Sequence, residues 1–333
     1  MDRKSDRIEW VDCAKGIGII LVVAGHSICP RELKYWLYTF HMPLFFFLSG
    51  LTFNYKKYNT FIVFIKSKIR TLIIPYIVLS VICFLWKLVN YIVLGTKMDI
   101  LSTLLGFIIQ IRGGRFGAGI WFLPLIFVTE LLIWCILRLG NERKKRVVTI
   151  ALVMLVIGYL YCRFVDVKLP WAVDSALVST FFMTIGFYSK SILNHKIGKL
   201  GLLFVIPNIT VGFLNSYMFD TRVDMWSNDY GSLVLYLISA FSGIYFCITL
   251  STIVKPNWLN YIGRYSLYFY GLHLMIVEVM TKVMNRVIDT SKVIDQYIAM
   301  FVTVLSVLLI LNVLPKKMDG FIKKYSDRIK ILK

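Results

Sequence analysis

The chain has 333 residues, of which 58% are hydrophobic and 17% charged, and its mean hydropathy is +0.72. A soluble globular protein of this length has too small an interior to bury so many apolar side chains, so we exclude that class. The formal net charge of +20 does not indicate nucleic-acid binding, because most basic residues stand in short segments between apolar blocks, where they set membrane orientation.

Apolar blocks of roughly 17–24 residues, the length of a membrane-crossing helix, recur along the chain. We therefore predict an all-α polytopic membrane protein with a single transmembrane domain over residues 1–333. The distribution of Lys and Arg places both termini in the cytoplasm, with a basic tail from about residue 315 that contacts anionic lipid. The ten predicted spans are 14–30, 35–53, 71–94, 119–137, 147–162, 173–189, 200–218, 231–254, 266–283 and 297–314.

The first span carries a cation and an imidazole on one side. Asp12 and Lys15 are three residues apart and share a helix face at the cytoplasmic mouth, either as an ion pair that caps the span or as binding groups. His26 follows Lys15 by eleven residues, which is about three helical turns and about 16 Å along the axis. We expect His26 to lie past the midplane, near the outer face.

A second histidine, His41, lies about two turns into the next span, which runs back inward. His26 and His41 should therefore have similar depth in adjacent antiparallel helices. Such a pair suits a general-base site, although an intramembrane histidine also serves as an interhelical hydrogen-bonding group. A metal site is not predicted, because no third or fourth ligand follows at a suitable spacing.

Three basic residues, Lys66, Lys68 and Arg70, precede the third span. They either anchor the cytoplasmic end of that span or form a cradle for the phosphates of a nucleotide-containing cofactor. The outer segment "QIRGGRFGAGIWFLP" supplies Arg112 and Arg115 among several glycines. Its guanidinium and backbone N–H groups suit an anion or a hydroxyl-rich ligand, and a plain flexible loop is the alternative.

Two later spans also contain ionisable residues. Glu130 falls in the middle of the fourth span, where a carboxylate is costly unless it is protonated or paired. It is interpreted either as the group that orients His26 or His41, or as a neutral core acid. His273 and Glu278 raise the same question in the ninth span; His273 is a candidate binding residue, and Glu278 approaches the outer interface.

Four motifs in the same order resemble the integral-membrane acyltransferase 3 family, and within it the sugar O-acetyltransferases similar to fucose 4-O-acetylase. The likeness spans nearly the whole chain. The motifs are "IEWVDCAKGIGIILVVAGH", "FHMPLFFFLSG", "GIWFLPLIFVTELL" and "YIGRYSLYFYGLH".

The resemblance implies a catalytic role for His26 and a role for Lys15 in binding the acyl donor or substrate. It also places Trp121 among the candidate binding residues. The family often has an Arg-x-x-Arg sequence before the third span, whereas this chain has "KSKIR" there, with Lys66, Lys68 and Arg70 at a different spacing.

The function implied is transfer of an acetyl or similar short acyl group across the cytoplasmic membrane. The donor would be cytoplasmic acetyl-CoA, and the acceptor a hydroxyl of a cell-surface glycan or its lipid-linked precursor. Two other functions are open from the residues alone. One is a secondary transporter or flippase with intramembrane His, Glu and Lys as a proton relay, and the other is a non-catalytic scaffold.

Overall fold

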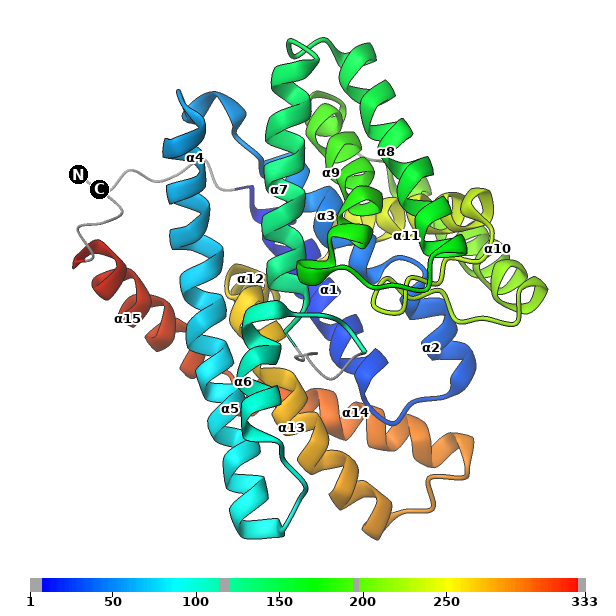
Figure 1. Cartoon of the computed structure of the whole chain (residues 1–333). Helices are drawn as coiled ribbons and strands as arrows, with labels where there is room; N and C mark the ends of the chain where they lie inside the picture. Colours follow the sequence, from blue (N-terminus) through cyan, green and yellow to red (C-terminus); the bar gives the residue numbers. More distant parts are fainter. Residues whose placement is uncertain (1–7, 114–119, 194–197, 329–333) are drawn as a thin grey trace. The chain divides into compact units, whose positions relative to one another are not determined.

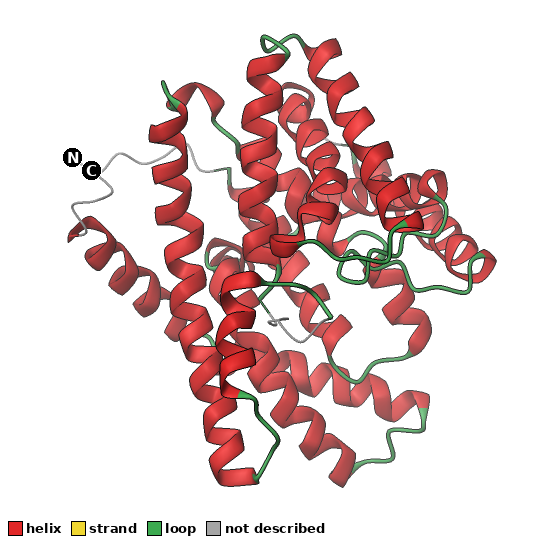
Figure 2. Cartoon of the chain, viewed as in Figure 1, coloured by secondary structure: helices red, strands yellow, loops and turns green. Residues whose placement is uncertain are grey.

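The structure is a computed structural model that describes residues 8–113, 120–193 and 198–328. Within these ranges the chain is mostly helical and has no strand (Figure 2). One isolated antiparallel bridge joins Asp224 and Asp229. The predicted all-α class is confirmed.

Two compact units are formed, each from segments that are distant in sequence. Unit 1 comprises Met1–Leu48, Ser191–Val223 and Gly231–Asn312. Unit 2 comprises Ser49–Lys190, Asp224–Tyr230 and Val313–Lys333.

The helices of unit 1 surround the first helix of the chain, α1, which contacts α2, α11, α12, α13 and α14 (Figure 1). Helices α13 and α14 follow each other as a helical hairpin. The bounds are α1 Glu9–His26, α2 Arg31–Tyr38, α3 His41–Thr52 up to Leu48, the 3₁₀ helix η4 Lys199–Phe204, α10 Val205–Met218, α11 Leu233–Ile253, α12 Asn257–Arg264, α13 Ser266–Val287 and α14 Val293–Ile310.

Unit 2 contains the long apolar helices from the middle of the sequence. Helix α7 contacts η2, η3 and α8, and α5 contacts α6 and α15. The bounds are η1 Tyr55–Lys57, α4 Phe61–Lys68, η2 Ile69–Ile73, α5 Ile74–Leu94, α6 Ile100–Ile109, α7 Phe122–Leu139, α8 Lys144–Phe164, η3 Pro170–Ala172, α9 Val173–Leu193 and α15 Leu314–Arg328.

Eight helices in the described part of the chain are long and apolar enough to cross a membrane. They confirm eight of the ten predicted spans. Their bounds are Phe61–Leu94, Phe122–Leu139, Lys144–Phe164, Pro170–Lys190, Lys199–Met218, Leu233–Ile253, Ser266–Val287 and Val293–Ile310.

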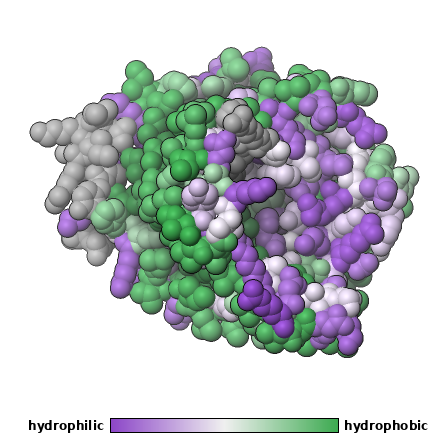
Figure 3. Space-filling model, turned by 60° about the horizontal axis from the view of Figure 1, so that its bottom comes forward, coloured by the Kyte–Doolittle hydropathy of each residue, from purple (hydrophilic) through white to green (hydrophobic). Residues whose placement is uncertain are grey.

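Apolar side chains also cover much of the visible surface (Figure 3). On α5, Ile77, Val81 and Leu85 are each more than half exposed and recur every four residues. A solvent-exposed stripe of this kind is unfavourable in water and suits contact with lipid. The protein is therefore a multi-pass membrane protein.

The first two predicted spans differ from simple apolar rods. Helix α1 has 18 residues and carries Glu9, Asp12 and Lys15 in its first two turns. The prediction of one helix over 35–53 is wrong, because α2 ends at Tyr38 and α3 begins at His41. Pro43 explains the interruption, since its ring would clash with the carbonyl four residues earlier in a continuous helix.

A π-helical turn, η2, connects α4 to α5 within one apolar rod. Such turns occur mostly as single insertions in α-helices and are frequent at functional sites. This turn contains Arg70 and follows Lys66 and Lys68 directly. The basic residues expected before the third span are therefore distributed across a change of helical type.

Two glycines allow the backbones of α1 and α12 to approach closely. A Cβ atom at Gly263 would overlap the carbonyl oxygen of Asp12, and one at Gly16 would overlap the carbonyl oxygen of Leu259. Small residues at helix interfaces permit such packing in membrane proteins. The two contacts fix the start of α1 against α12.

Gly263→Ala is expected to destabilise the protein, because the backbone of α1 must move away from the new methyl group. Overpacking of this kind lowers the free energy of unfolding by about 1–3 kcal/mol. Thermal unfolding of the detergent-purified protein measures the change. Gly198→Ala is the matched control, since its Cβ meets nothing within 4 Å. Equal melting temperatures for both variants would contradict the close contact.

Candidate functional site

His26 is the last residue of α1, and its side chain is exposed although Gly25 and Ser27 on either side are buried. The hydroxyl of Ser27 donates a 2.7 Å hydrogen bond to the carbonyl of Ala24, and its N–H donates to the carbonyls of Val23 and Ala24. These bonds close the helix end. The result is an accessible imidazole on a fixed piece of backbone.

Tyr38, the last residue of α2, has a histidine on each side. Its ring centroid is 6.3 Å from that of His26 and 4.8 Å from that of His41, with edge-on geometry in both cases. His41 is the first residue of α3 and is only 2% exposed. The break between α2 and α3 thus brings His26 and His41 to one aromatic ring.

The proton of His41 is placed by a main-chain contact. Its Nδ1 lies 2.6 Å from the carbonyl oxygen of Leu37. A carbonyl oxygen only accepts, so Nδ1 donates its proton and Nε2 carries the lone pair. At the interruption the N–H of Phe40 also donates to this carbonyl, at 3.5 Å, so the imidazole shares in capping the end of α2.

Interhelical hydrogen bonds hold the same interruption in place. The indole N–H of Trp36 donates to the side-chain oxygen of Asn208 on α10. The amide nitrogen of Asn208 donates to the hydroxyl of Thr39 at 3.2 Å and to the carbonyl of Ser239 on α11 at 2.9 Å. Asn208 is fully buried, so these bonds anchor the segment that carries Tyr38.

His273, from the middle of α13, completes a group of three histidines. Its ring centroid is 5.2 Å from that of His26, and the planes are inclined by 53°. Its Nδ1 lies 2.6 Å from the carbonyl oxygen of Tyr270, so this nitrogen also donates. His273 is 1% exposed, which leaves His26 as the accessible member of the group.

Two cations lie near this group. The guanidinium of Arg222 stacks on the ring of Tyr38, with 4.1 Å between its carbon and the ring centroid, and both Lys34 and Arg222 exert positive charge on His26. Sequence reasoning missed Tyr38 and Arg222. Tyr38 stands in an apolar stretch, and Arg222 stands between Asp220 and Asp224, so composition alone indicated neither.

The arrangement in unit 1 suits proton transfer at a site where negative charge develops. The accessible imidazole can accept a proton or act as a nucleophile, and the buried imidazoles have defined tautomers. Cationic and phenolic groups beside it can stabilise an oxyanion. This is the chemistry of acyl transfer to a hydroxyl.

Comparison with known proteins agrees with that chemistry. A family profile described as "Acyltransferase domain" matches residues 8–313. The chain belongs to the acyltransferase 3 family. No curated protein and no solved structure matches the chain. Together with the apolar helices, family membership identifies a membrane acyltransferase.

At the other end of α1 in this acyltransferase 3 protein, Asp12 is buried and Lys15 is half-buried. Eleven residues of helix, about 16 Å, separate Lys15 from His26. Asp12 lies where α12 approaches α1 most closely. Lys15 is therefore a candidate binding group at the opposite end of the helix, and it does not contact the imidazoles.

Glu130 of this acyltransferase pairs with a lysine in unit 2. Its carboxylate is 2.9 Å from the ammonium of Lys68, and both side chains are at least 85% buried. The ammonium also lies between 5.3 and 5.9 Å from the ring centroids of Phe53, Tyr58 and Phe64. Such an aromatic cage stabilises a desolvated cation. Lys68, which the sequence suggests for phosphate binding, is therefore engaged in a buried ion pair. Lys66 and Arg70 are half-buried.

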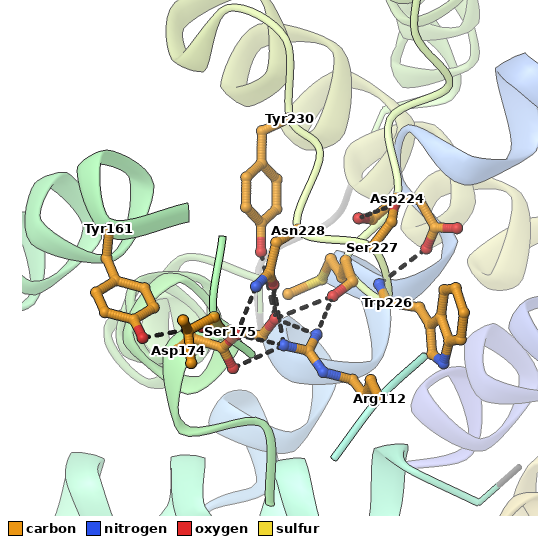
Figure 4. A network of polar contacts seen from close by, with 11 residues as sticks. Arg112, Tyr161, Asp174, Ser175, Asp224, Trp226, Ser227, Asn228 and Tyr230 are labelled. Carbon is orange, nitrogen blue, oxygen red and sulfur yellow. Dashed lines mark hydrogen bonds and ion pairs between the residues drawn. The ribbon is translucent and has the colours of Figure 1, made fainter. Parts of the chain in front are cut away.

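Arg112 is fully buried, which differs from the open anion site predicted from its glycine-rich segment. One nitrogen, Nη2, donates to both carboxylate oxygens of Asp174 at 2.6 Å, and Nη1 donates to the hydroxyl of Ser175 at 2.6 Å. Asn228 also donates to Asp174 (Figure 4). Asp174 neutralises the charge of Arg112. The network of Arg112, Asp174, Ser175 and Asn228 joins the loop 224–230 to the start of α9.

The remaining parts of this network are also structural. Burial raises the pKa of Tyr230, so its phenol stays neutral beside Ser175. The guanidinium carbon of Arg112 lies 5.6 Å from the ring centroid of Trp121, which is 8% exposed. The indole thus packs on the buried cation. Arg115 lies outside the described residues.

Glu278 forms a surface ion pair with Lys282 one turn later on α13, with 2.8 Å between carboxylate and ammonium. Both side chains are more than 40% exposed, so Glu278 is accounted for without a role at the site. Among the residues with described positions, no group of three or more His, Cys, Asp or Glu side chains could hold a metal ion.

Proposed function

We propose that this acyltransferase 3 protein moves an acetyl or similar short acyl group from cytoplasmic acetyl-CoA to a hydroxyl of a cell-surface glycan or its lipid-linked precursor. The cytoplasmic membrane is its location in this proposal. The observation that carries the proposal is the accessible imidazole of His26 beside two buried imidazoles of defined tautomer.

In the direct route, His26 accepts the proton of the acceptor hydroxyl as the oxygen attacks the thioester carbonyl. The tetrahedral oxyanion then expels the thiolate of coenzyme A, which takes the proton back from His26. The products are an acetate ester and free coenzyme A thiol. In the alternative route, His26 attacks the thioester carbonyl and expels the thiolate of coenzyme A. The acceptor hydroxyl then displaces the acetyl group from the imidazole, and its proton passes to the thiolate.

Electrostatic stabilisation of the oxyanion is assigned to unit 1. Arg222 is held on the face of Tyr38, and Tyr38 contacts the ring of His26. A guanidinium fixed in advance beside the reacting carbonyl stabilises charge that develops in the transition state. Lys15 of unit 1 is proposed to bind the donor or the substrate. For unit 2, Lys66 and Arg70 are proposed, independently of Lys15, to bind the phosphates of the donor.

The proposal is tested with the purified protein in liposomes containing lipid-linked glycan extract and radiolabelled acetyl-CoA. The expected result is label in the glycan fraction that is released as acetate by mild alkali, as an ester requires. Liposomes without the protein supply the background. Uptake or flipping of substrate without any ester formation would reject the proposal in favour of transport.

A further inference from the structure

The buried nitrogen of His273 that faces away from Tyr270 has an unmet hydrogen-bonding capacity. Because Nδ1 donates to the carbonyl of Tyr270, Nε2 of the neutral imidazole carries a lone pair. This Nε2 has less than 1 Å² of accessible surface and no hydrogen-bond partner in the described part of the chain. Buried polar atoms are nearly always satisfied, so an unsatisfied acceptor calls for a specific explanation.

The ring of His273 has the imidazole of His26 as a neighbour. Two imidazoles joined by an N–H···N hydrogen bond of about 3 Å have centroids about 5 Å apart. The observed separation is 5.2 Å at an inclination of 53°. A rotation of the exposed His26 side chain can therefore align one of its N–H groups with Nε2 of His273, without movement of α1 or α13.

The direction of that hydrogen bond is set by His273 alone. Since its Nδ1 proton is held by Tyr270, His273 can accept from His26 and cannot donate to it through Nε2. His26 would then keep its proton on the nitrogen that faces His273. Its other nitrogen would present a lone pair to the acyl acceptor.

We propose that His273 is a positioning residue that fixes the tautomer and orientation of His26, an inference that rests on the proposed function. When His26 takes a proton from the hydroxyl, both of its nitrogens bear hydrogen and it becomes a cation. The hydrogen bond to His273 then becomes charge-assisted and stronger. His273 gains and loses no proton in the cycle, because its own proton stays on Nδ1.

His273→Phe and His273→Gln separate this role from packing. Phenylalanine keeps an aromatic ring in the buried site but has no acceptor, whereas glutamine restores an acceptor oxygen. Phe269→Leu, a buried neighbour in α13 at 1% exposure, is the matched control for altered packing. His273→Leu serves as a second acceptor-free variant if the phenylalanine variant does not purify as a folded protein.

The first readout needs no enzymatic activity. Diethyl pyrocarbonate acylates the lone pair of neutral imidazole, and mass spectrometry reports its rate at His26. Loss of the fixed tautomer lowers the competent fraction of His26, so we expect a roughly two- to tenfold slower reaction in the phenylalanine and leucine variants. The glutamine variant and Phe269→Leu should react at nearly the wild-type rate.

The second readout is steady-state acyl transfer. The acceptor-free variants should lose about 10²-fold in kcat, while KM for acetyl-CoA stays unchanged, and glutamine should recover much of the loss. Equal behaviour of His273→Phe and Phe269→Leu in both readouts would overturn the positioning role, as would a glutamine variant as impaired as phenylalanine. If wild-type protein transfers no acetyl group, the proposed function fails, and the modification rates still decide whether His273 controls His26.

Discussion

His26→Ala is expected to reduce acyl transfer by about 10³-fold or more, while the protein stays folded and inserted. General-base or nucleophilic groups contribute rate factors of about 10²–10⁴, and alanine at this position retains neither function. The fold should persist, because His26 is an exposed residue at the end of α1. Alanine also has a higher helix propensity than histidine.

The measurement is release of coenzyme A thiol together with formation of alkali-labile acetate in the glycan fraction. Lys282→Ala is the control, since Lys282 lies on the exposed face of α13 in an ion pair with Glu278. It should be as active as wild type. Wild-type turnover by a folded His26→Ala protein would exclude His26 from the chemistry. The buried His41 and His273 would then have no accessible imidazole to act through.

Arg112→Met is expected to lower the free energy of unfolding by about 3–5 kcal/mol, because it leaves the carboxylate of Asp174 buried without its cation. Both side chains of this ion pair are 0% exposed. The loop 224–230 should lose its attachment to α9 at the same time. Thermal unfolding in detergent and protease cleavage within that loop measure the two effects.

Two comparisons establish the physical cause. The double variant Arg112→Met/Asp174→Leu removes both buried charges and should recover most of the lost stability, since apolar replacement of a whole buried pair is often neutral. Lys282→Met breaks an exposed pair on α13 and should cost less than about 1 kcal/mol. A single Arg112→Met variant as stable as Lys282→Met would show that the buried pair does not hold the loop.

The sequence predicts the spans well, because contact with lipid demands long apolar helices whatever their partners. The interruption at Thr39 and Phe40 is not predicted, because a hydropathy window averages over residues on both sides of the break. Pro43 is the one local signal for it. The polar contacts were harder to predict. Depth along a helix follows from residue spacing, whereas the direction in which a side chain points around the axis depends on packing.

Glu130 illustrates this limit. Its position within a span predicts a buried carboxyl group that either orients His26 or His41 or remains a neutral core acid. The structure supplies Lys68, which belongs to a segment that the sequence assigns to membrane anchoring or phosphate binding. The contact between His26 and His273 is another case, because it joins residues that are 247 positions apart, and no local pattern records it.

The π-helical turn Ile69–Ile73 sets the rotation of α5 about its axis relative to α4. A turn of this type contains one residue more than the α-helical turn it replaces. Each residue advances an α-helix by about 100°, so deletion of a single residue there would rotate the apolar stripe of α5 by about a quarter of a circle against its neighbours. A natural relative that lost this residue would need compensating substitutions along α5 to keep the same side chains towards lipid.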